Sequence, residues 1–311
     1  MGIVPTDVPM TSALSEQSIR ELESRYPFVK VENLTTTVFG RPVLALEIGD
    51  GEREVLFTAA HHANEWITTP LLLKFAEELA QAIAQDGEIY GVPARTIARN
   101  TTIHLVPMVN PDGVDLVTVA IPPETVAYET ARGISEGFPD IPFPDGWKAN
   151  LLGVDLNLQY PAGWLQAREI KFGQGFDRPA PRDYVGRAPL SQRESIALAQ
   201  YTEDVDPALV LAYHTQGQVI YWQFEEYEVP GARELAEEFA RVSGYALEDT
   251  PYQSAYAGYK DWFIKYFRRP GFTIEVGSGT NPLPLSQFDE IYRDNLGILV
   301  TAALGLSEEK G

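Results

Sequence analysis

The amino-acid sequence predicts an α/β fold in which a largely parallel sheet is covered by helices on both faces. Short apolar runs of strand length alternate with amphipathic segments of helical length along most of the 311 residues. The hydrophobic content of 44% is enough for a full core, and a chain of this length forms one large domain or two smaller ones. We expect one domain, in which residues 1–49 form a helix and a hairpin joined to a core of residues 50–311.

The N-terminal part of the chain predicts a surface helix followed by a hairpin. Residues 13–26 carry apolar side chains among charges, as a surface helix does, and a proline follows them. Two β-rich runs within residues 29–49 meet at a Gly-Arg-Pro turn and predict the hairpin. Residues 54–60 then predict a buried strand, and residues 69–85 predict a helix with a proline in its first turn.

The middle of the chain contains two long stretches with little periodicity. An apolar strand is predicted over residues 102–110, and it stops at an Asn-Pro-Asp-Gly turn signal. Residues 119–150 are rich in proline and glycine, so we interpret them as an ordered surface loop over a site. Residues 161–190 are similarly loop-like.

Regular structure returns in the C-terminal part of the chain, where helices again alternate with strands. Predicted helices cover residues 191–205, 231–244, 258–267 and 285–304, and predicted strands cover residues 207–215, 218–224 and 271–277. In a sheet of this kind ligands bind beyond the carboxyl ends of the strands.

The composition excludes several classes of partner and site. The net charge of −20 argues against nucleic acid and against anionic membranes, because both require a dense basic face. No run reaches eighteen apolar residues, so no transmembrane helix is predicted. Without cysteine, a metal site must use His, Asp or Glu. The N-terminus shows no signal peptide, so we expect a cytoplasmic location, or the cell wall or spore if the chain is trimmed.

Two histidines and a glutamate at strand ends form a candidate metal site. His62 and Glu65 are three residues apart in a turn that follows the strand at 54–60, and His214 ends a second apolar strand. Together they make a His₂Glu ligand set of the kind that binds catalytic zinc and leaves a position open. We interpret the other two histidines, His61 and His104, as structural.

Two carboxylates complete the candidate site. Metal-bound imidazoles usually donate their second N–H to a carboxylate or carbonyl, so Asp155 is a candidate partner for His62. Glu275 is a lone acid in an apolar strand, where loss of solvation would raise its pKa toward that of a general base. The alternative for Asp155 is an ordinary turn aspartate, and the alternative for Glu275 is a carboxylate satisfied by buried hydrogen bonds. Both alternatives stay open at this point.

In these motifs the sequence resembles the zinc carboxypeptidase superfamily, the metallopeptidases related to pancreatic carboxypeptidase A. Six pieces occur in the expected order over residues 50–305: H-x-x-E-W at His62, NPDG at Asn110, GVDLN at Gly153, the strand-end His214, Asp261-Trp262, and F-T-x-E ending at Glu275. The resemblance implies a mixed, mainly parallel sheet of about eight strands.

The resemblance also implies the cofactor and the catalytic roles. His62, Glu65 and His214 would hold one zinc ion, which acidifies water and polarises the scissile carbonyl. Glu275 would take a proton from the attacking water and pass it to the departing amine. Lys148 resembles the family's oxyanion-stabilising arginine in position, and a lysine supplies a cation there.

One departure from the family pattern bears on the substrate. The exopeptidases of the family have Asn-Arg after the GVD motif, and the arginine grips the substrate's terminal carboxylate. This chain has Asn157 and Leu158 instead, so recognition of an ordinary peptide C-terminus is in doubt. The surrounding sequence is similar to the bacterial γ-D-glutamyl-L-diamino acid peptidases, which cut peptidoglycan stem peptides.

The similarity implies a murein peptide as the partner and three further substrate-binding residues. Asn157 keeps its place in the motif, and Lys260 matches a position in the family's specificity pocket, where it would pair with a substrate carboxylate. A solvated helix lysine is the alternative. The family's mobile tyrosine aligns with Gln253, so Tyr252 fits with a one-residue insertion and Tyr256 with a deletion.

Two rival functions remain open, a conventional zinc carboxypeptidase acting on α-linked peptides and an inactive peptide-binding homologue. The sequence leaves the oligomeric state and the residue after D-glutamate undetermined.

Overall fold

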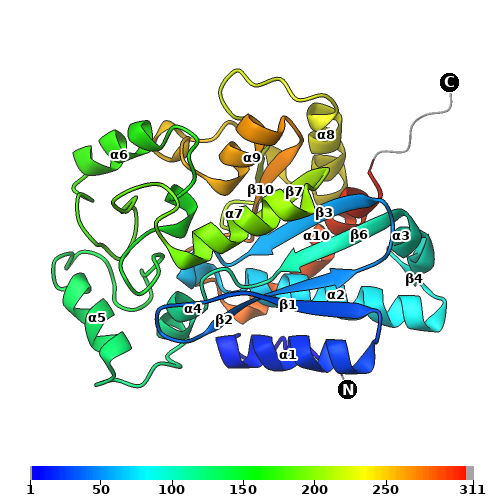
Figure 1. The fold of residues 1–311 in the computed structure, drawn as a ribbon, viewed down its shortest axis with the longest axis horizontal. Helices are drawn as coiled ribbons and strands as arrows, with labels where there is room; N and C mark the ends of the chain where they lie inside the picture. The colour runs from blue at the N-terminus through cyan, green and yellow to red at the C-terminus, as the bar shows by residue number, and fades with distance from the viewer. Residues whose placement is uncertain (1, 306–311) are drawn as a thin grey trace.

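The computed structural model describes residues 2–305, which fold around one eight-stranded sheet (Figure 1). The spatial order of the strands is β1-β2-β6-β3-β7-β10-β8-β9. The strands are β1 (Val29–Thr36), β2 (Pro42–Ile48), β3 (Arg53–Ala59), β6 (Thr101–Val106), β7 (Leu209–Thr215), β8 (Val219–Tyr221), β9 (Ala246–Leu247) and β10 (Gly271–Val276). A separate two-stranded hairpin consists of β4 (Glu88–Ile89) and β5 (Val92–Pro93).

The centre of the sheet is parallel, whereas the hairpin edge is antiparallel. β3 pairs in parallel with β6 and β7, and β7 pairs in parallel with β10. The predicted hairpin is the antiparallel pair of β1 and β2, and β2 joins β6 in antiparallel fashion. All seven residues of β7 are buried, which agrees with the continuous apolar run from Leu209 to Tyr213 in the sequence.

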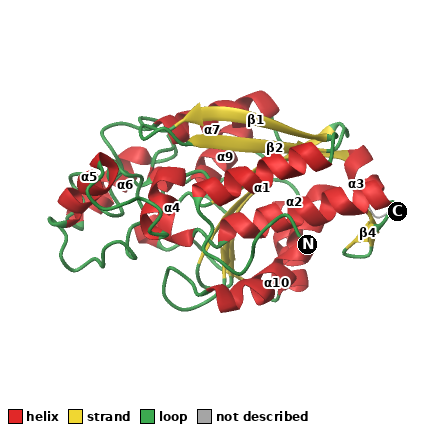
Figure 2. Cartoon of the chain, turned by 90° about the horizontal axis from the view of Figure 1, so that it is seen from below, coloured by secondary structure: helices red, strands yellow, loops and turns green. Residues whose placement is uncertain are grey.

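In the described part of the chain, helices cover both faces of this sheet. Side chains of α1, α2, α3, α8 and α10 pack on one face, where Phe57 and Leu211 point from the strands. Side chains of α7 and α9 pack on the other face, together with Leu56 and Val210. Figure 2 shows α1, α2 and α10 together below the sheet. The helices are α1 (Ser12–Arg25), α2 (Thr68–Gln85), α3 (Ala94–Asn100), α4 (Pro111–Val117), α5 (Val126–Ser135), α6 (Trp164–Gly173), α7 (Arg193–Val205), α8 (Ala232–Ser243), α9 (Tyr259–Phe267) and α10 (Phe288–Leu304).

The structure corrects the sequence-based interpretation of the long loops. Residues 119–150 contain α5, and residues 161–190 contain α6. Helix α5 begins at the Thr125 cap, and Ala127, Tyr128, Ala131 and Ile134 form an apolar stripe that packs against the core, although only Ala131 is buried. The GVDLN segment leads into a 3₁₀ turn at Leu156–Leu158.

Two further predictions, outside these two stretches, need correction. The Asn-Pro-Asp-Gly sequence is the start of a helix as well as a turn, because Asn110 caps α4 by accepting from the Gly113 N–H. The strand predicted over residues 218–224 is shorter, and β8 ends at Tyr221. Among residues 2–305 no helix combines the length and the apolar composition needed to cross a bilayer.

The three strands that carry the candidate site end at the same edge of the sheet. β3, β7 and β10 run in parallel, and Glu275 of β10 is the cross-strand partner of His214 of β7. Neighbouring residues on paired strands project to the same face, so these two side chains point together toward the side covered by α7 and α9.

Candidate active site

His62, Glu65 and His214 converge in the buried region beyond these strand ends. The Nδ1 atoms of the two histidines lie 3.2 Å apart. Glu65 places Oε1 2.9 Å from Nδ1 of His62 and Oε2 2.9 Å from Nδ1 of His214. One ligand atom from each residue therefore faces a single point, and all three side chains are buried.

Local backbone structure explains how two of these ligands come from one short segment. β3 ends at Ala59, and His62 then caps a 3₁₀ turn over Ala63–Glu65. Thr68 stabilises the turn, because its hydroxyl donates to the Glu65 carbonyl and accepts from the Ala60 N–H. The 3₁₀ geometry brings residues three apart onto one side, so His62 and Glu65 face the same point.

The donor set fits zinc. Two imidazole nitrogens and a carboxylate are the ligands of catalytic His₂Glu zinc sites, which keep a fourth position for water or substrate. A separation of 3.2 Å between Nδ1 atoms suits two nitrogens that each lie about 2.0–2.1 Å from one tetrahedral ion. The concentration of acceptor atoms at this point also favours a cation there.

Asp155 links the ligand set to a second segment of the chain. Its Oδ1 lies 3.1 Å from Nε2 of His62, which is the ring nitrogen that does not face the metal position. Its Oδ2 accepts from the backbone N–H of Asp183 at 3.2 Å. The structure thus brings Asp155 to His62 in the arrangement expected from the sequence, where a carboxylate fixes the tautomer and orientation of a ligand.

The close packing of the ligand set shifts the pKa values of its three residues. Burial would lower the pKa of His62, but the carboxylates of Glu65 and Asp155 raise it to about 9. Burial would raise the pKa of Glu65, yet His62 and Lys148 hold it well below its usual value. The pKa of His214 is lowered, chiefly by burial. Glu65 is therefore a carboxylate, the state needed for a ligand.

We expect Asp155→Asn to weaken zinc binding by about tenfold to 100-fold, because the amide loses the charge that makes the His62 imidazole more basic. Competition between the protein and a chelating indicator dye measures this change. The exposed Asp177 supplies a matched control, and Asp177→Asn should bind zinc as the wild type does. Wild-type zinc affinity in Asp155→Asn would mean that His62 needs no carboxylate partner.

Glu275 and Lys148 lie beside the ligand set. Burial and the negative charge of Glu65 raise the pKa of Glu275 to about 8, while Lys148 and His62 oppose this shift. Lys148 donates from Nζ to Oε1 of Glu65 at 2.8 Å. Glu275 is thus poised to take up and release a proton, and Lys148 supplies a fixed cation next to it.

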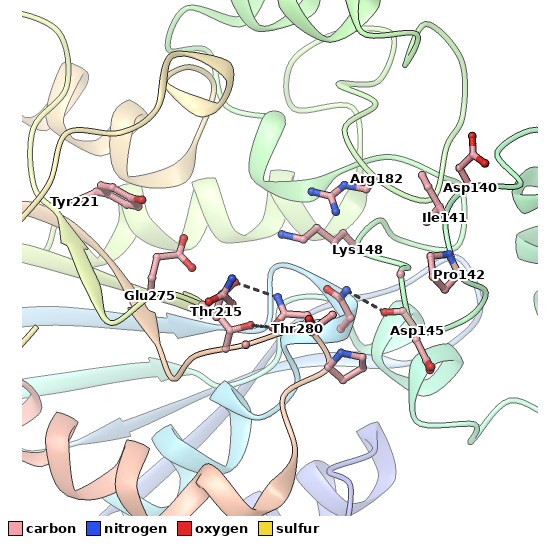
Figure 3. Close-up of a pocket in the computed structure, with 16 residues that line it drawn as sticks. Asp140, Ile141, Pro142, Asp145, Lys148, Arg182, Thr215, Tyr221, Glu275 and Thr280 are labelled. Atoms are coloured by element: carbon pink, nitrogen blue, oxygen red, sulfur yellow. Dashed lines mark hydrogen bonds between the residues drawn. The ribbon is translucent and has the colours of Figure 1, made fainter. Parts of the chain in front are cut away.

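Two cavities meet at this point. The larger one, of about 880 Å³, is lined by residues of the 140–148 segment, by Arg182 and by residues 279–282. The smaller one, of about 170 Å³, is lined by His62, His214, Asn157 and Lys260. Lys148, Tyr221 and Glu275 border both cavities. In Figure 3, the cationic ends of Lys148 and Arg182 point from one side toward Glu275 and Tyr221.

Asn157 and Lys260 both line the smaller cavity. Asn157 Oδ1 accepts from the Tyr259 N–H at 3.0 Å, which ties the GVDLN segment to the start of α9. Lys260 is only 4% exposed, so it is not a solvated helix lysine. Its Nζ donates to the Gln223 carbonyl at 2.5 Å and lies 2.6 Å from Asp261 Oδ1. Asp261 therefore already balances the charge of Lys260, and pairing of this lysine with a substrate stays a prediction.

Tyr252 is not among the residues that line the two cavities, and its assignment as the mobile substrate-binding tyrosine stays a prediction. Tyr252 begins a 3₁₀ turn, and it is 67% exposed. Pro251 and Ser254 of this segment line the smaller cavity. Residues three apart share one side of a 3₁₀ turn, so the residue after Pro251 is turned away from that side. Tyr221 is the tyrosine that borders both cavities.

His61 and His104, the two histidines outside the ligand set, have different surroundings from each other. His61 is buried, stacks on the His214 ring at a centroid distance of 5.5 Å, and lies 3.3 Å from the Tyr160 hydroxyl. Burial keeps its pKa well below 6.5, so it is a neutral support behind the ligand set. His104 lies 2.7 Å from both Glu54 and the Tyr201 hydroxyl.

Sequence reasoning missed Arg182 and Tyr221, both of which line the larger cavity. Arg182 follows a Pro-Ala-Pro run in a stretch without periodicity, where one arginine is indistinguishable from a surface charge. Tyr221 ends the short strand β8, whose antiparallel pairing with β10 was not predictable from its residues.

The chain matches the family model described as zinc carboxypeptidase over residues 15–297. A curated relative, γ-D-glutamyl-L-diamino acid endopeptidase 1 of Lysinibacillus sphaericus, is 47% identical over 288 residues, which cover 91% of this chain and 69% of the relative.

Two solved structures share the fold at low sequence identity. Bovine thrombin-activatable fibrinolysis inhibitor superimposes with a TM-score of 0.73 at 18% identity, covering 96% of this chain and 97% of the other. Murein-tripeptide amidase MpaA from Escherichia coli O157 gives a TM-score of 0.54 at 20% identity, covering 87% of this chain and 91% of the other.

The family description names zinc, and the ligand set fits that ion. This chain belongs to the zinc carboxypeptidase family and is a metallopeptidase.

Proposed function

We propose that this protein hydrolyses the bond between γ-D-glutamate and an L-diamino acid, such as meso-diaminopimelate, in peptidoglycan stem peptides. The observation that carries the proposal is the 47% identity, over most of both chains, to an enzyme named as a γ-D-glutamyl-L-diamino acid endopeptidase. A murein peptide is therefore the proposed substrate.

The surroundings of the active site support an acidic substrate. Leu158, in the place of the arginine that grips a peptide C-terminus in the family's exopeptidases, is buried and carries no charge. Three cations instead border the two cavities, namely Lys148, Arg182 and Lys260. A chain with a net charge of −20 repels anions at long range, so local cations are needed to hold a substrate with several carboxylates.

The metal ligands and Glu275 have different roles in hydrolysis. When bound by His62, Glu65 and His214, zinc supplies Lewis acidity that makes water a better nucleophile and polarises the scissile carbonyl. Glu275 accepts a proton from the attacking water and donates it to the amine of the departing diamino acid. Burial and the charge of Glu65 raise the pKa of Glu275 to about 8, and a cation at the ligand set would act in the opposite direction.

Lys148 stabilises the negative charge that develops on the carbonyl oxygen during attack. Its ammonium group is fixed by Glu65 Oε1 at 2.8 Å and borders both cavities, so it needs little reorganisation to act. Burial would lower the pKa of Lys148, but the Glu65 carboxylate raises it, which keeps the side chain charged at neutral pH.

Mass spectrometry of the products from L-Ala-γ-D-Glu-meso-diaminopimelate, with and without a further D-Ala, tests the proposal. We expect release of diaminopimelate, or of its D-Ala dipeptide, with zinc present and none after chelation. Survival of both peptides while α-linked peptides lose their last residue would assign the chain a conventional carboxypeptidase activity instead. C-terminally amidated substrates separate the two functions further, because a strict carboxypeptidase rejects them.

A further inference from the structure

Arg182 lines the larger cavity and has unused hydrogen-bonding capacity. Its Nε donates to Asp183 Oδ2 at 2.6 Å. Within residues 2–305, Nη1 and Nη2 have no hydrogen-bond partner, although the side chain is less than half exposed. A guanidinium whose Nη atoms are free presents the fork that binds a carboxylate through two parallel hydrogen bonds.

The surrounding contacts hold this guanidinium in place. Asp183 accepts from Arg182 through Oδ2 and from the buried Lys171 through Oδ1, at 2.5 Å from Nζ. On the other side, the Pro181 carbonyl accepts from the backbone N–H groups of Lys148 and Ala149. Arg182 is therefore attached directly to the segment that carries the active-site lysine.

Asp155 connects the same segment to the metal site. One of its carboxylate oxygens lies against the ligand His62, and the other accepts from the Asp183 N–H. The position of Arg182 is thus fixed relative to the metal site, where the substrate bond is broken. A residue that recognises a substrate group needs such a fixed position.

We infer that Arg182 binds the free α-carboxylate of the γ-linked D-glutamyl residue, on the acyl side of the scissile bond. This inference rests on the proposed function. A γ-linked glutamyl group keeps its α-carboxylate a short distance from the scissile carbonyl, whereas the acyl residue of an ordinary α-linked peptide has an amide there. A cation that binds this carboxylate would therefore select γ-linked substrates.

The two cavities suit the two sides of the scissile bond. Glu275 borders both, Arg182 lines only the larger, and Lys260 lines only the smaller. A stem peptide continues from its glutamyl residue through L-Ala toward the glycan, so the acyl side needs the larger and more open cavity. The diamino acid then occupies the smaller cavity beside Asn157 and Lys260.

The other charged residues of the larger cavity make Arg182 the best candidate for this contact. Lys148 is the cation assigned to the scissile carbonyl oxygen, and Glu275 is an acid. Asp140 and Asp145 also line the cavity, and Figure 3 shows them away from Glu275, on the far side of Lys148. An anionic group placed against these aspartates would be repelled, so their positions favour the Arg182 end.

The test compares two substrates that differ only in the proposed contact. One is L-Ala-γ-D-Glu-meso-diaminopimelate, and the other carries D-isoglutamine, in which the α-carboxylate is an amide. We expect Arg182→Gln to lower kcat/KM for the first substrate by about 10- to 100-fold, and to change kcat/KM for the second by less than about threefold. The wild-type preference for the carboxylate substrate should disappear.

Two further variants make the result specific. Arg182→Lys keeps the positive charge but loses the paired Nη donors of the guanidinium. It should therefore recover only part of the carboxylate preference. Arg187→Gln removes an exposed arginine five residues further along the same segment and should behave as the wild type with both substrates. Unchanged zinc content in every variant excludes a disturbance of the metal site through Asp155.

The outcomes separate this inference from the proposed function. Equal losses on both substrates, or no loss on either, would overturn the role of Arg182 while γ-D-glutamyl hydrolysis by the wild type stands. If the zinc-loaded wild type cleaves neither peptide, the proposed function is wrong, and the inference about Arg182 falls with it.

Discussion

Glu275→Gln is expected to lower kcat by about 10²–10⁴-fold while leaving one zinc ion bound per chain. Glutamine has nearly the same shape as glutamate but cannot take a proton from water or return one to the departing amine. Glu275 is not among the three side chains that converge as ligands, so the metal should stay in place. Steady-state kinetics and metal analysis on the same preparation measure both properties.

Glu169→Gln is the matched control, because it makes the same change on the exposed side of α6. It should retain wild-type kcat and zinc content. Turnover of Glu275→Gln within a fewfold of the wild type would remove Glu275 from the proton transfers. Loss of zinc together with activity would instead give this glutamate a part in metal binding.

His214→Phe should abolish both stoichiometric zinc binding and hydrolysis. Phenylalanine fills the space of the ring at the end of β7 but offers no Nδ1, and two ligands from the 62–65 turn remain. Loss of a carboxylate that only supports a ligand typically weakens metal binding by about 10–100-fold, so loss of the ligand itself should exceed that. Metal analysis after dialysis and assays with added zinc measure the effect.

His104→Gln provides the histidine control for this experiment. His104 lies on β6 and contacts Glu54 and Tyr201 rather than the ligand set. This variant should keep one zinc ion and full activity. Chelation of the wild type should remove activity, and one equivalent of zinc should restore it. A zinc-replete and active His214→Phe would show that the metal is held elsewhere.

The sequence by itself predicted most of the fold and the residues of the ligand set. Buried parallel strands such as β7 are unbroken apolar runs, and helices such as α2 combine apolar spacing with recognisable ends, so both are visible in local sequence. His62 and Glu65 share one turn, which makes their proximity a local property. His214 and Glu275 end strands of one parallel sheet, where the carboxyl ends meet by topology.

Short helices inside proline-rich and glycine-rich stretches were harder to predict. The apolar stripe of α5, formed by Ala127, Tyr128, Ala131 and Ile134, lies on a helix of 10 residues in such a stretch, and only Ala131 is buried. Tyr252 illustrates a related difficulty, because the direction of a side chain on a short 3₁₀ turn depends on where that turn packs. Local sequence does not show where that turn packs.

Tertiary structure alone decided that Arg182 lies at the larger cavity and that Asp261 balances the charge of Lys260. Arg182 reaches the larger cavity through the pairing of Pro181 with residues 148 and 149 and through the Asp155 contact to Asp183. Lys260 faces the smaller cavity, where the adjacent Asp261 balances its charge. These placements depend on contacts between segments distant in the chain, whereas strand periodicity and the H-x-x-E turn depend on neighbours. The sequence therefore determined the metal ligand set, and only the folded chain placed Arg182 at the larger cavity and Asp261 against Lys260.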